Sequence, residues 1–322
     1  MKPRSLFVLA AALAVFAAAM PATAAPSKSN TKPDGKGIGT KFHHPLAMPG
    51  NGITYHGGPV MLSNKHIYYI WYGWGGGLGS TPDILNNLAS NIGGSPYFNI
   101  NTTYFDANNN HIQNSVAFNP LTDQAYNHYS LGKNLDDDGV FAVVTNALTR
   151  KQLPVDPNGV YFVLTSPDVN ETTGFCSQYC GWHDSQNYKA TRIHFAFIGD
   201  GDQCPDGCEA QSISPNNNPG ADGMASVIAH ELEESATDPN VASGANSFSA
   251  DGWFNTQGAE NGDLCAWTFG NTSTCSDGGC SGGSGANGAS YNMTLGAKQY
   301  LIQQNWVNAN GGFCALRYPN AP

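Results

Sequence analysis

The sequence contains few charged residues, and few of these are basic. Charged residues make up 12% of the 322 residues, and 14 Lys and Arg stand against 24 Asp and Glu, which gives a formal net charge of −10. Nucleic acids and anionic membrane surfaces are bound by concentrated basic surfaces. The composition therefore argues against a nucleic-acid partner and against attachment to an anionic membrane.

Long apolar runs are also missing, apart from one at the start of the chain. Lys2 and Arg4 precede an apolar run from Leu6 to Met20, which small residues follow. This order is typical of a secretory signal peptide, and the run is shorter than the ~20 residues of a spanning helix. We predict a signal peptide over residues 1–24, a secreted extracellular protein and no membrane span.

Cysteine is absent before residue 176. All eight cysteines lie in the C-terminal half, at Cys176, Cys180, Cys204, Cys208, Cys265, Cys275, Cys280 and Cys314. An even number in an exported chain predicts disulfides and leaves the pairing open. The two CxxxC spacings could instead bind zinc, which an oxidising compartment disfavours.

Several motifs of common enzyme classes are lacking too. The chain has no P-loop, and neither a GxSxG elbow nor a GxGxxG motif follows a predicted strand. The usual signals of serine hydrolases and of nucleotide-binding and dinucleotide-binding proteins are therefore missing. Its paired carboxylates do not stand in a recognisable glycosidase context. Oxidised cysteines exclude thiolate catalysis.

The apolar pattern predicts one mixed domain of α/β or α+β class, because strands and helices alternate without strict βαβ order. Residues 25–56 are rich in Pro, Gly, Lys, Ser and Asn and are expected to be a disordered mature N-terminus. The globular domain is expected over 57–318. Its predicted strands are 66–73, 141–144, 159–165 and 193–199, and its predicted helices are 81–92, with Thr81 as N-cap, and 216–239, with Asp222 as a cap.

The most informative segment is the HExxE sequence of the second helix. His230 and Glu234 are four residues apart and lie on one helical face, so both can bind one cation. This is the spacing of HExxH metalloproteases with Glu in place of the second His, and Glu231 would act as general base. Hydrolytic zinc takes three protein ligands, and Glu260 is the predicted third. Asp263 would orient a ligand His or exchange roles with Glu260.

A charged helical face exposed to solvent is the simpler interpretation of this segment. Against it, Ala225, Ala229, Leu232 and Ala236 recur at helical spacing and predict that the helix is buried. Buried carboxylates need a cation or a hydrogen-bond donor. A zincin-like arrangement around a buried HExxE helix is therefore expected.

His183 is a further candidate. It follows a cysteine pair and Gly181, so its backbone is expected to be fixed, as a ligand or an oxyanion-stabilising catalytic residue requires. A structural His that caps a turn is the alternative.

Blocks of sequence from about residue 57 to Cys314 resemble the EXORDIUM, or phosphate-induced, family in their order and content. The blocks are Gly58–Val60, Ile70–Gly73, Gly159–Val169, Phe175–His183, Cys204–Cys208, Asp222–Pro239, Glu260–Cys265 and Gly288–Met293. The resemblance implies an extracellular, cell-wall-associated protein. It also implies a metal site at the positions that match the family's motif, which are His230, Glu231, Glu234, Glu260 and Asp263. The signal sequence looks bacterial, so the growth and hormone roles of the plant members are not transferred.

Two hypotheses follow. The first is a secreted zinc-dependent hydrolase, metallopeptidase-like, that acts as a monomer on an extracellular protein, peptide or cell-wall substrate. The second is a non-catalytic extracellular or cell-wall-associated protein in which the same cluster binds a structural cation. Oxygen-rich ligation favours Ca²⁺, whereas the imidazole favours Zn²⁺.

Overall fold

The computed structural model describes residues 52–241, 251–276, 280 and 288–318. The predicted signal peptide and most of the predicted disordered N-terminus lie outside the described residues. Strand β1 (Thr54–Tyr55) pairs with β10 (Trp253–Phe254), and Ile53 is buried. The last residues of the segment 25–56 therefore belong to the folded domain.

A six-stranded sheet forms the centre of the domain. Strands β2 (Lys65–Tyr72), β6 (Gly159–Thr165) and β9 (Thr191–Ile198) run parallel to one another, and β8 (Gly181–Tyr188) pairs antiparallel with β9 at one edge. The short strands β3 (Val116–Ala117) and β4 (Gln124–Asn127) pair with the other side of β2. The central strands are almost continuously apolar, because they are buried on both faces. Three of the four predicted strands are thus confirmed to within two residues.

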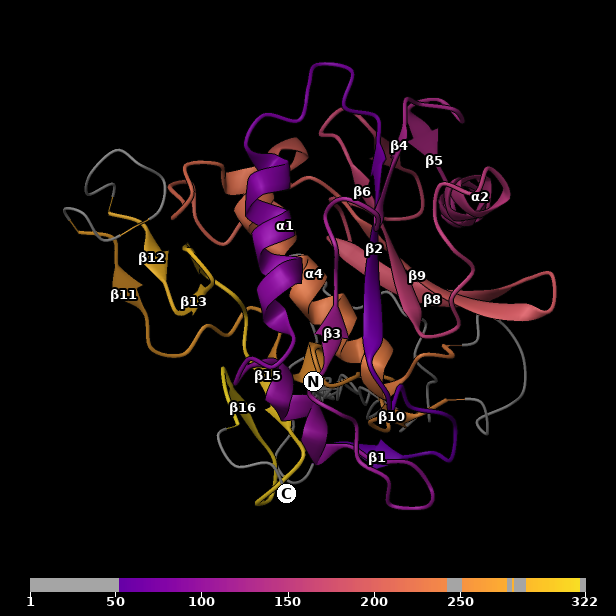
Figure 1. Ribbon diagram of the computed structural model, residues 1–322. Coiled ribbons are helices and arrows are strands. Elements are labelled where there is room, and N and C mark those ends of the chain that lie inside the picture. The colour runs from indigo at the N-terminus through magenta and orange to yellow at the C-terminus, as the bar shows by residue number, and fades with distance from the viewer. Residues whose placement is uncertain (1–51, 242–250, 277–279, 281–287, 319–322) are drawn as a thin grey trace, which may run out of the picture.

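Helices cover both faces of this sheet (Figure 1). Helix α4 (Pro219–Thr237) packs on β6, β8 and β9, and α1 (Thr81–Ile92) packs on α4 and β3. Helix α2 (Asp137–Thr149) covers the opposite face, against β2, β6 and β9. The domain is therefore a three-layer α/β structure, which agrees with the predicted mixed class. Within the described residues, no helix combines the length and apolar character needed to cross a membrane.

Two helix starts and one strand differ from the predictions. Residues 141–144, expected as a strand, lie inside α2, because Val140, Val143, Val144, Ala147 and Leu148 form one buried helical face. In α4 the N-cap is Asn218, whose side chain accepts the N–H of Ala221, and not Asp222. In α1 the predicted cap Thr81 is the first helical residue, after Ser80.

The remaining elements are short and lie mainly around the sheet edges and in the C-terminal part. They are the helical turns η1 (Phe98–Thr103), η2 (Gly201–Gln203), α3 (Pro205–Cys208) and η4 (Asp263–Cys265), and the strand pairs β5 (Asn134–Leu135) with β7 (Asn170–Glu171), β11 (Ser273–Thr274) with β12 (Ser290–Tyr291), β13 (Met293–Leu295) with β14 (Lys298–Tyr300), and β15 (Asn305–Val307) with β16 (Phe313–Ala315).

All eight cysteines form disulfides, so the predicted bridges of the C-terminal half are confirmed and the zinc interpretation of the CxxxC spacings is wrong. The pairs are Cys176–Cys204, Cys180–Cys208, Cys265–Cys314 and Cys275–Cys280. Each cysteine of one CxxxC motif pairs with a cysteine of the other motif, 28 positions away, and not with the cysteine of its own motif. Two parallel bridges therefore tie the segment before β8 to the segment before α4.

Candidate metal centre

The HExxE segment lies in the buried second half of α4. Every residue from Met224 to Thr237 is buried, because the helix is enclosed between α1 and the sheet. Nε2 of His230 lies 2.8 Å from Oε1 of Glu234, as their four-residue spacing on one helical face predicts. The neighbouring Glu231 is also fully buried, and its Oε1 has no hydrogen-bond partner. The helix therefore places an imidazole and two carboxylates in the protein interior.

The segment 260–265 brings two more carboxylates to the same place. The backbone N–H of Glu260 donates to Oδ2 of Asp263 at 3.1 Å, and the N–H of Asp263 donates to Oε1 of Glu234 at 3.1 Å. A Cβ at Gly262 would lie 2.8 Å from the ring of His230 and 2.9 Å from Oε1 of Glu234. Only glycine permits this close approach of the backbone.

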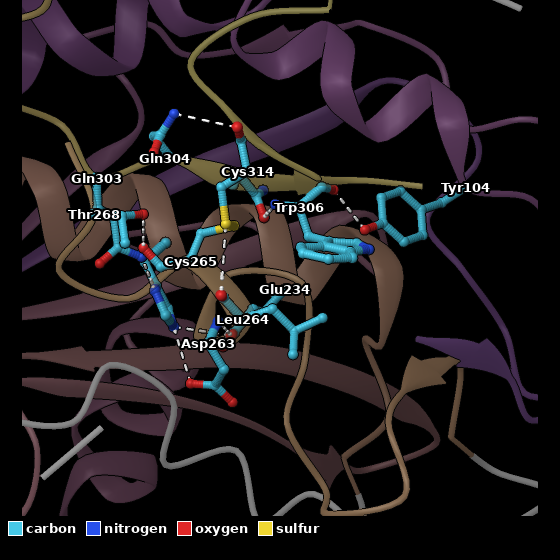
Figure 2. Close-up of a disulfide and its surroundings, with 12 residues drawn as sticks. Tyr104, Glu234, Asp263, Leu264, Cys265, Thr268, Gln303, Gln304, Trp306 and Cys314 are labelled. Carbon is cyan, nitrogen blue, oxygen red and sulfur yellow. Dashed lines mark hydrogen bonds and ion pairs between the residues drawn. A yellow bond between two sulfur atoms is a disulfide. The ribbon is translucent and has the colours of Figure 1, made fainter. Parts of the chain in front are cut away.

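The Cys265–Cys314 disulfide anchors this segment to the C-terminal hairpin. Figure 2 shows the bridge together with Asp263 and with Glu234 of α4. Sγ of Cys314 lies 3.5 Å from the carbonyl oxygen of Leu264. The bridge therefore fixes the backbone that carries Asp263.

His183 lies on strand β8, opposite Ala196 of β9, and joins the same cluster. Its Nδ1 lies 3.2 Å from Glu231 Oε2 and 3.5 Å from Glu234 Oε2. Its Nε2 lies 3.6 Å from Glu260 Oε1 and 3.3 Å from the carbonyl oxygen of Asp238. Sheet pairing thus delivers a residue that is far from α4 in the sequence to the centre of the cluster.

Two groups of three side chains have donor atoms that all lie within 4.8 Å of one another. They are His183 with Glu234 and Glu260, and His230 with Glu231 and Glu234. Among the described residues, the predicted trio of His230, Glu234 and Glu260 is not one of these groups. Glu234 is shared by both, so it is the central carboxylate of the cluster.

The cluster holds more acidic than basic side chains. Four carboxyl groups, on Glu231, Glu234, Glu260 and Asp263, face two imidazoles, and all are buried. One oxygen of each carboxyl group makes no hydrogen bond, and Nε2 of His230 contacts Oε1 of Glu234 as an ion pair without hydrogen-bond geometry. Burying unpaired polar atoms and net charge is costly unless a cation compensates them. The arrangement is thus suited to a divalent cation.

The pKa values of the cluster depend on burial and on the two histidines. Burial raises the pKa of Glu231, and it raises the pKa of Glu260 and Asp263 well above the ordinary range. Burial acts in the same direction on Glu234, but the neighbouring His230 outweighs it and the pKa of Glu234 falls to about 2. Burial opposes the charged form of His230, yet Glu234 raises its pKa to about 9. Glu234 is thus the carboxylate most firmly held in its charged form.

One residue of the cluster was not predicted from the sequence. Gln303, in the segment between β14 and β15, is fully buried, and its amide contacts Nδ1 of His230. It therefore occupies the orienting position for which Asp263 was predicted, whereas Asp263 lies 3.7 Å from the other nitrogen, Nε2. A single Gln 73 residues from His230 carries no signal in the sequence.

Comparison with known proteins agrees with the sequence resemblance. The Phosphate-induced protein 1 conserved region matches residues 53–315. EXORDIUM-like 5 of Arabidopsis thaliana is 31% identical over 304 residues, covering 82% of this chain and 77% of that protein. EXORDIUM-like 3 of the same plant is 31% identical over 290 residues, covering 79% and 80%.

A tobacco relative is more distant. The protein PHOSPHATE-INDUCED 1 of Nicotiana tabacum is 25% identical over 213 residues, which cover 58% of this chain and 65% of that protein. No solved structure matches the chain significantly. The match of the conserved region over most of the chain, together with these relatives, establishes that the chain belongs to the phosphate-induced protein 1 family, which includes the EXORDIUM-like proteins.

Proposed function

We propose that this protein is a secreted zinc-dependent hydrolase of metallopeptidase type. The observation that carries the proposal is the buried acidic excess around Glu234, where four carboxyl groups meet two imidazoles. In hydrolytic sites zinc is usually bound by three protein ligands, mostly imidazole and carboxylate groups, and keeps a fourth position open. The presence of two histidines favours zinc over calcium, which takes six to eight oxygen ligands.

The ligands are drawn from three elements of the fold. His230 and Glu234 of α4 face each other, and His183 of β8 and Glu260 lie on the other side of Glu234. Gln303 holds Nδ1 of His230, which leaves Nε2 directed toward Glu234 and Asp263. Fixing one imidazole nitrogen in this way sets the orientation of the ring and leaves the other nitrogen for the cation.

Glu231 is the proposed general base. Glu231 is next to His230 in the sequence, and one of its carboxylate oxygens lies within 4.8 Å of possible ligand atoms of His230 and Glu234. Its Oε1 makes no hydrogen bond. Zinc would polarise the scissile carbonyl and acidify a water molecule. Glu231 would then accept a proton from that water and return it to the leaving amine, as general acid–base catalysis requires.

The test compares two neighbouring glutamates of α4. Glu231→Gln removes the proposed base, whereas Glu233→Gln alters an equally buried carboxyl group that faces Asn305 at 2.6 Å outside the cluster. We expect Glu231→Gln to retain bound zinc, measured by mass spectrometry, and to lose at least about 100-fold in chelator-sensitive hydrolysis of casein. Glu233→Gln should keep both. A Glu231→Gln variant as active as the parent would refute the general-base role, and a purified chain without metal would refute the site.

A structural cation is the second candidate, and one observation favours it. The side chains of the cluster are almost completely enclosed, with His183 and Glu260 at 1% exposure and His230, Glu231 and Glu234 at 0%. A closed shell of protein ligands is the usual form of a structural metal site, whereas a catalytic site keeps an open position. Bound metal without any chelator-sensitive hydrolysis would establish this function in place of the first.

A further inference from the structure

A second site lies at the edge of the sheet where the parallel strands end. A cavity of about 360 Å³ is lined by Trp74, just after β2, by Ser166, just after β6, and by Asp200, just after β9. The loop from β2 to α1, at the top of Figure 1, forms one rim. Ligands of open parallel sheets bind in this position, because the connections to the following helices diverge there. The volume is within the range of small-molecule sites.

This cavity is separate from the candidate metal centre. Asn218, at the start of α4, lines the cavity, whereas His230 lies three turns further along the helix. At a rise of ~1.5 Å per residue the two positions are roughly 18 Å apart. Among the described residues, the carboxylates of the cavity are not among the groups whose donor atoms converge as metal ligands. A function of this cavity is therefore independent of the proposed hydrolase.

Asp200 supplies the observation that points to a ligand. Its side chain is 3% exposed and lines the cavity, and its Oδ1 accepts the N–H of Asp202 at 3.0 Å. Within the described part of the chain, its Oδ2 has no hydrogen-bond partner, and the neighbouring charge of Asp202 is of the same sign. The side chain is buried as a whole, but Oδ2 is not one of the fully enclosed oxygens that lack a partner, so it stays open to the cavity and available to a hydrogen-bond donor. A bound molecule that donates a hydrogen bond would satisfy it.

Two aromatic side chains, Trp74 and Tyr129, also line the cavity. The indole N–H of Trp74 donates to the carbonyl of Leu164 at 3.0 Å, which satisfies its polar atom and holds its ring in place. The hydroxyl of Tyr129 accepts the N–H of Gly75 at 3.2 Å and bonds to Asp168 at 2.9 Å. Both rings are partly exposed at the cavity. They offer apolar surface next to fixed hydrogen-bonding groups.

The charges of the cavity favour a neutral ligand over a cation. Lys133 lies 2.6 Å from Oδ2 of Asp168 and compensates its charge. Burial raises the pKa of Asp200 to about 7, so near neutral pH this group is partly uncharged. Asp202 is exposed to solvent, which screens it. A cation would find little net attraction here, whereas hydroxyl groups can both donate to Asp200 and accept from backbone N–H groups.

We propose that this cavity binds a neutral carbohydrate. A ring hydroxyl donates to Oδ2 of Asp200, and the apolar C–H face of the sugar packs on Trp74. The glycine-rich loop from β2 to α1, residues 73–80, forms the open side of the cavity. A longer saccharide can extend past this loop into solvent. Gly76 in this loop has no atom within 4 Å of the place a Cβ would take and has an ordinary φ angle. A side chain can therefore be added there without strain.

The test uses isothermal titration calorimetry of the full mature chain. The probes are cellohexaose, xylohexaose and mannohexaose as neutral saccharides, and spermidine as a cation. We expect at least one saccharide to bind, and Trp74→Ala and Asp200→Leu each to weaken its binding by about tenfold or more. Tyr126→Ala, which removes an aromatic ring that is 48% exposed outside the cavity, is the matched control and should bind as the parent does.

Gly76→Phe keeps the proposal falsifiable if the other variants unfold. It adds a ring at an open position of the cavity rim, so it should melt at the parent temperature and yet block saccharide binding. Binding of none of the three saccharides, or saccharide binding that Gly76→Phe and Trp74→Ala leave unchanged, would overturn the proposal. Binding of spermidine alone would overturn the ligand class.

Discussion

Opening the Cys265–Cys314 disulfide should destabilise the fold and the candidate metal centre together. The bridge closes a segment of 49 positions, and its first cysteine is two residues after Asp263. In the chain-entropy description, a loop of this length stabilises the folded state by about 4 kcal/mol at 25 °C, because the bridge restricts the unfolded chain. The double variant Cys265→Ala/Cys314→Ala should therefore lose about this much free energy of unfolding, measured by urea titration.

Metal affinity is the second measurement on this variant. The bridge holds the backbone that places Glu260 and Asp263 beside Glu234, so metal retention should fall along with stability. The matched control is Cys275→Ala/Cys280→Ala, whose bridge spans only 5 positions. Its expected loss is about 2 kcal/mol, with metal binding unchanged. Equal losses of stability in the two variants, or full metal retention in the first, would refute the reasoning.

Three further outcomes are expected. Gln303→Leu should keep the fold but lower zinc affinity by about 10–100-fold, because Nδ1 of His230 loses the group that holds it; unchanged affinity in a chelator competition would contradict this. Removing the metal with a chelator should lower the melting temperature, since the carboxylates around Glu234 lose their compensating charge; an unchanged melting curve in a chain shown to contain metal would exclude a stabilising role. Asp200→Asn should stabilise the protein increasingly as the pH rises from 4 to 8, measured by urea titration against the parent.

The sign of the Asp200 effect follows from linkage. Burial raises the pKa of Asp200 in the folded state from 3.8 to about 7, so between these values the folded protein holds a proton that the unfolded chain releases. This contribution to stability is complete below the unfolded pKa and is lost as the pH rises through the folded pKa. The total cost above pH 7 is on the order of 4 kcal/mol. Asn does not titrate, so a difference between variant and parent that stays constant with pH would contradict the assignment.

The different surroundings of the buried glutamates of α4 allow the role of each one in the candidate metal centre to be tested separately. Glu233 and Glu234 are adjacent and equally buried, but successive side chains of a helix point about 100° apart. Glu233 faces Asn305 at 2.6 Å, whereas Glu234 faces His230 at 2.8 Å. Substituting either residue by Gln therefore removes one carboxyl group from a different set of surroundings.

Several features could be predicted from the sequence because they depend on neighbours in the chain. The facing of His230 and Glu234 follows from helical spacing. The strand 159–165 follows from its apolar, β-branched composition. The even number of cysteines predicted disulfides. The short segment 141–144 was mistaken for a strand, because four apolar residues do not distinguish a strand from a buried helical face.

Only the tertiary structure decided which residues from different segments meet. His183 enters the cluster through the pairing of β8 with β9, and Gln303 through the segment that follows β14. The disulfides between the two CxxxC motifs likewise depend on how the fold brings the two segments together. Local spacing sets the direction of side chains on one element, whereas contacts between elements depend on how the whole chain packs its apolar faces. For this reason the sequence indicated the helix of the centre, and the packing of the sheet and loops supplied its other groups.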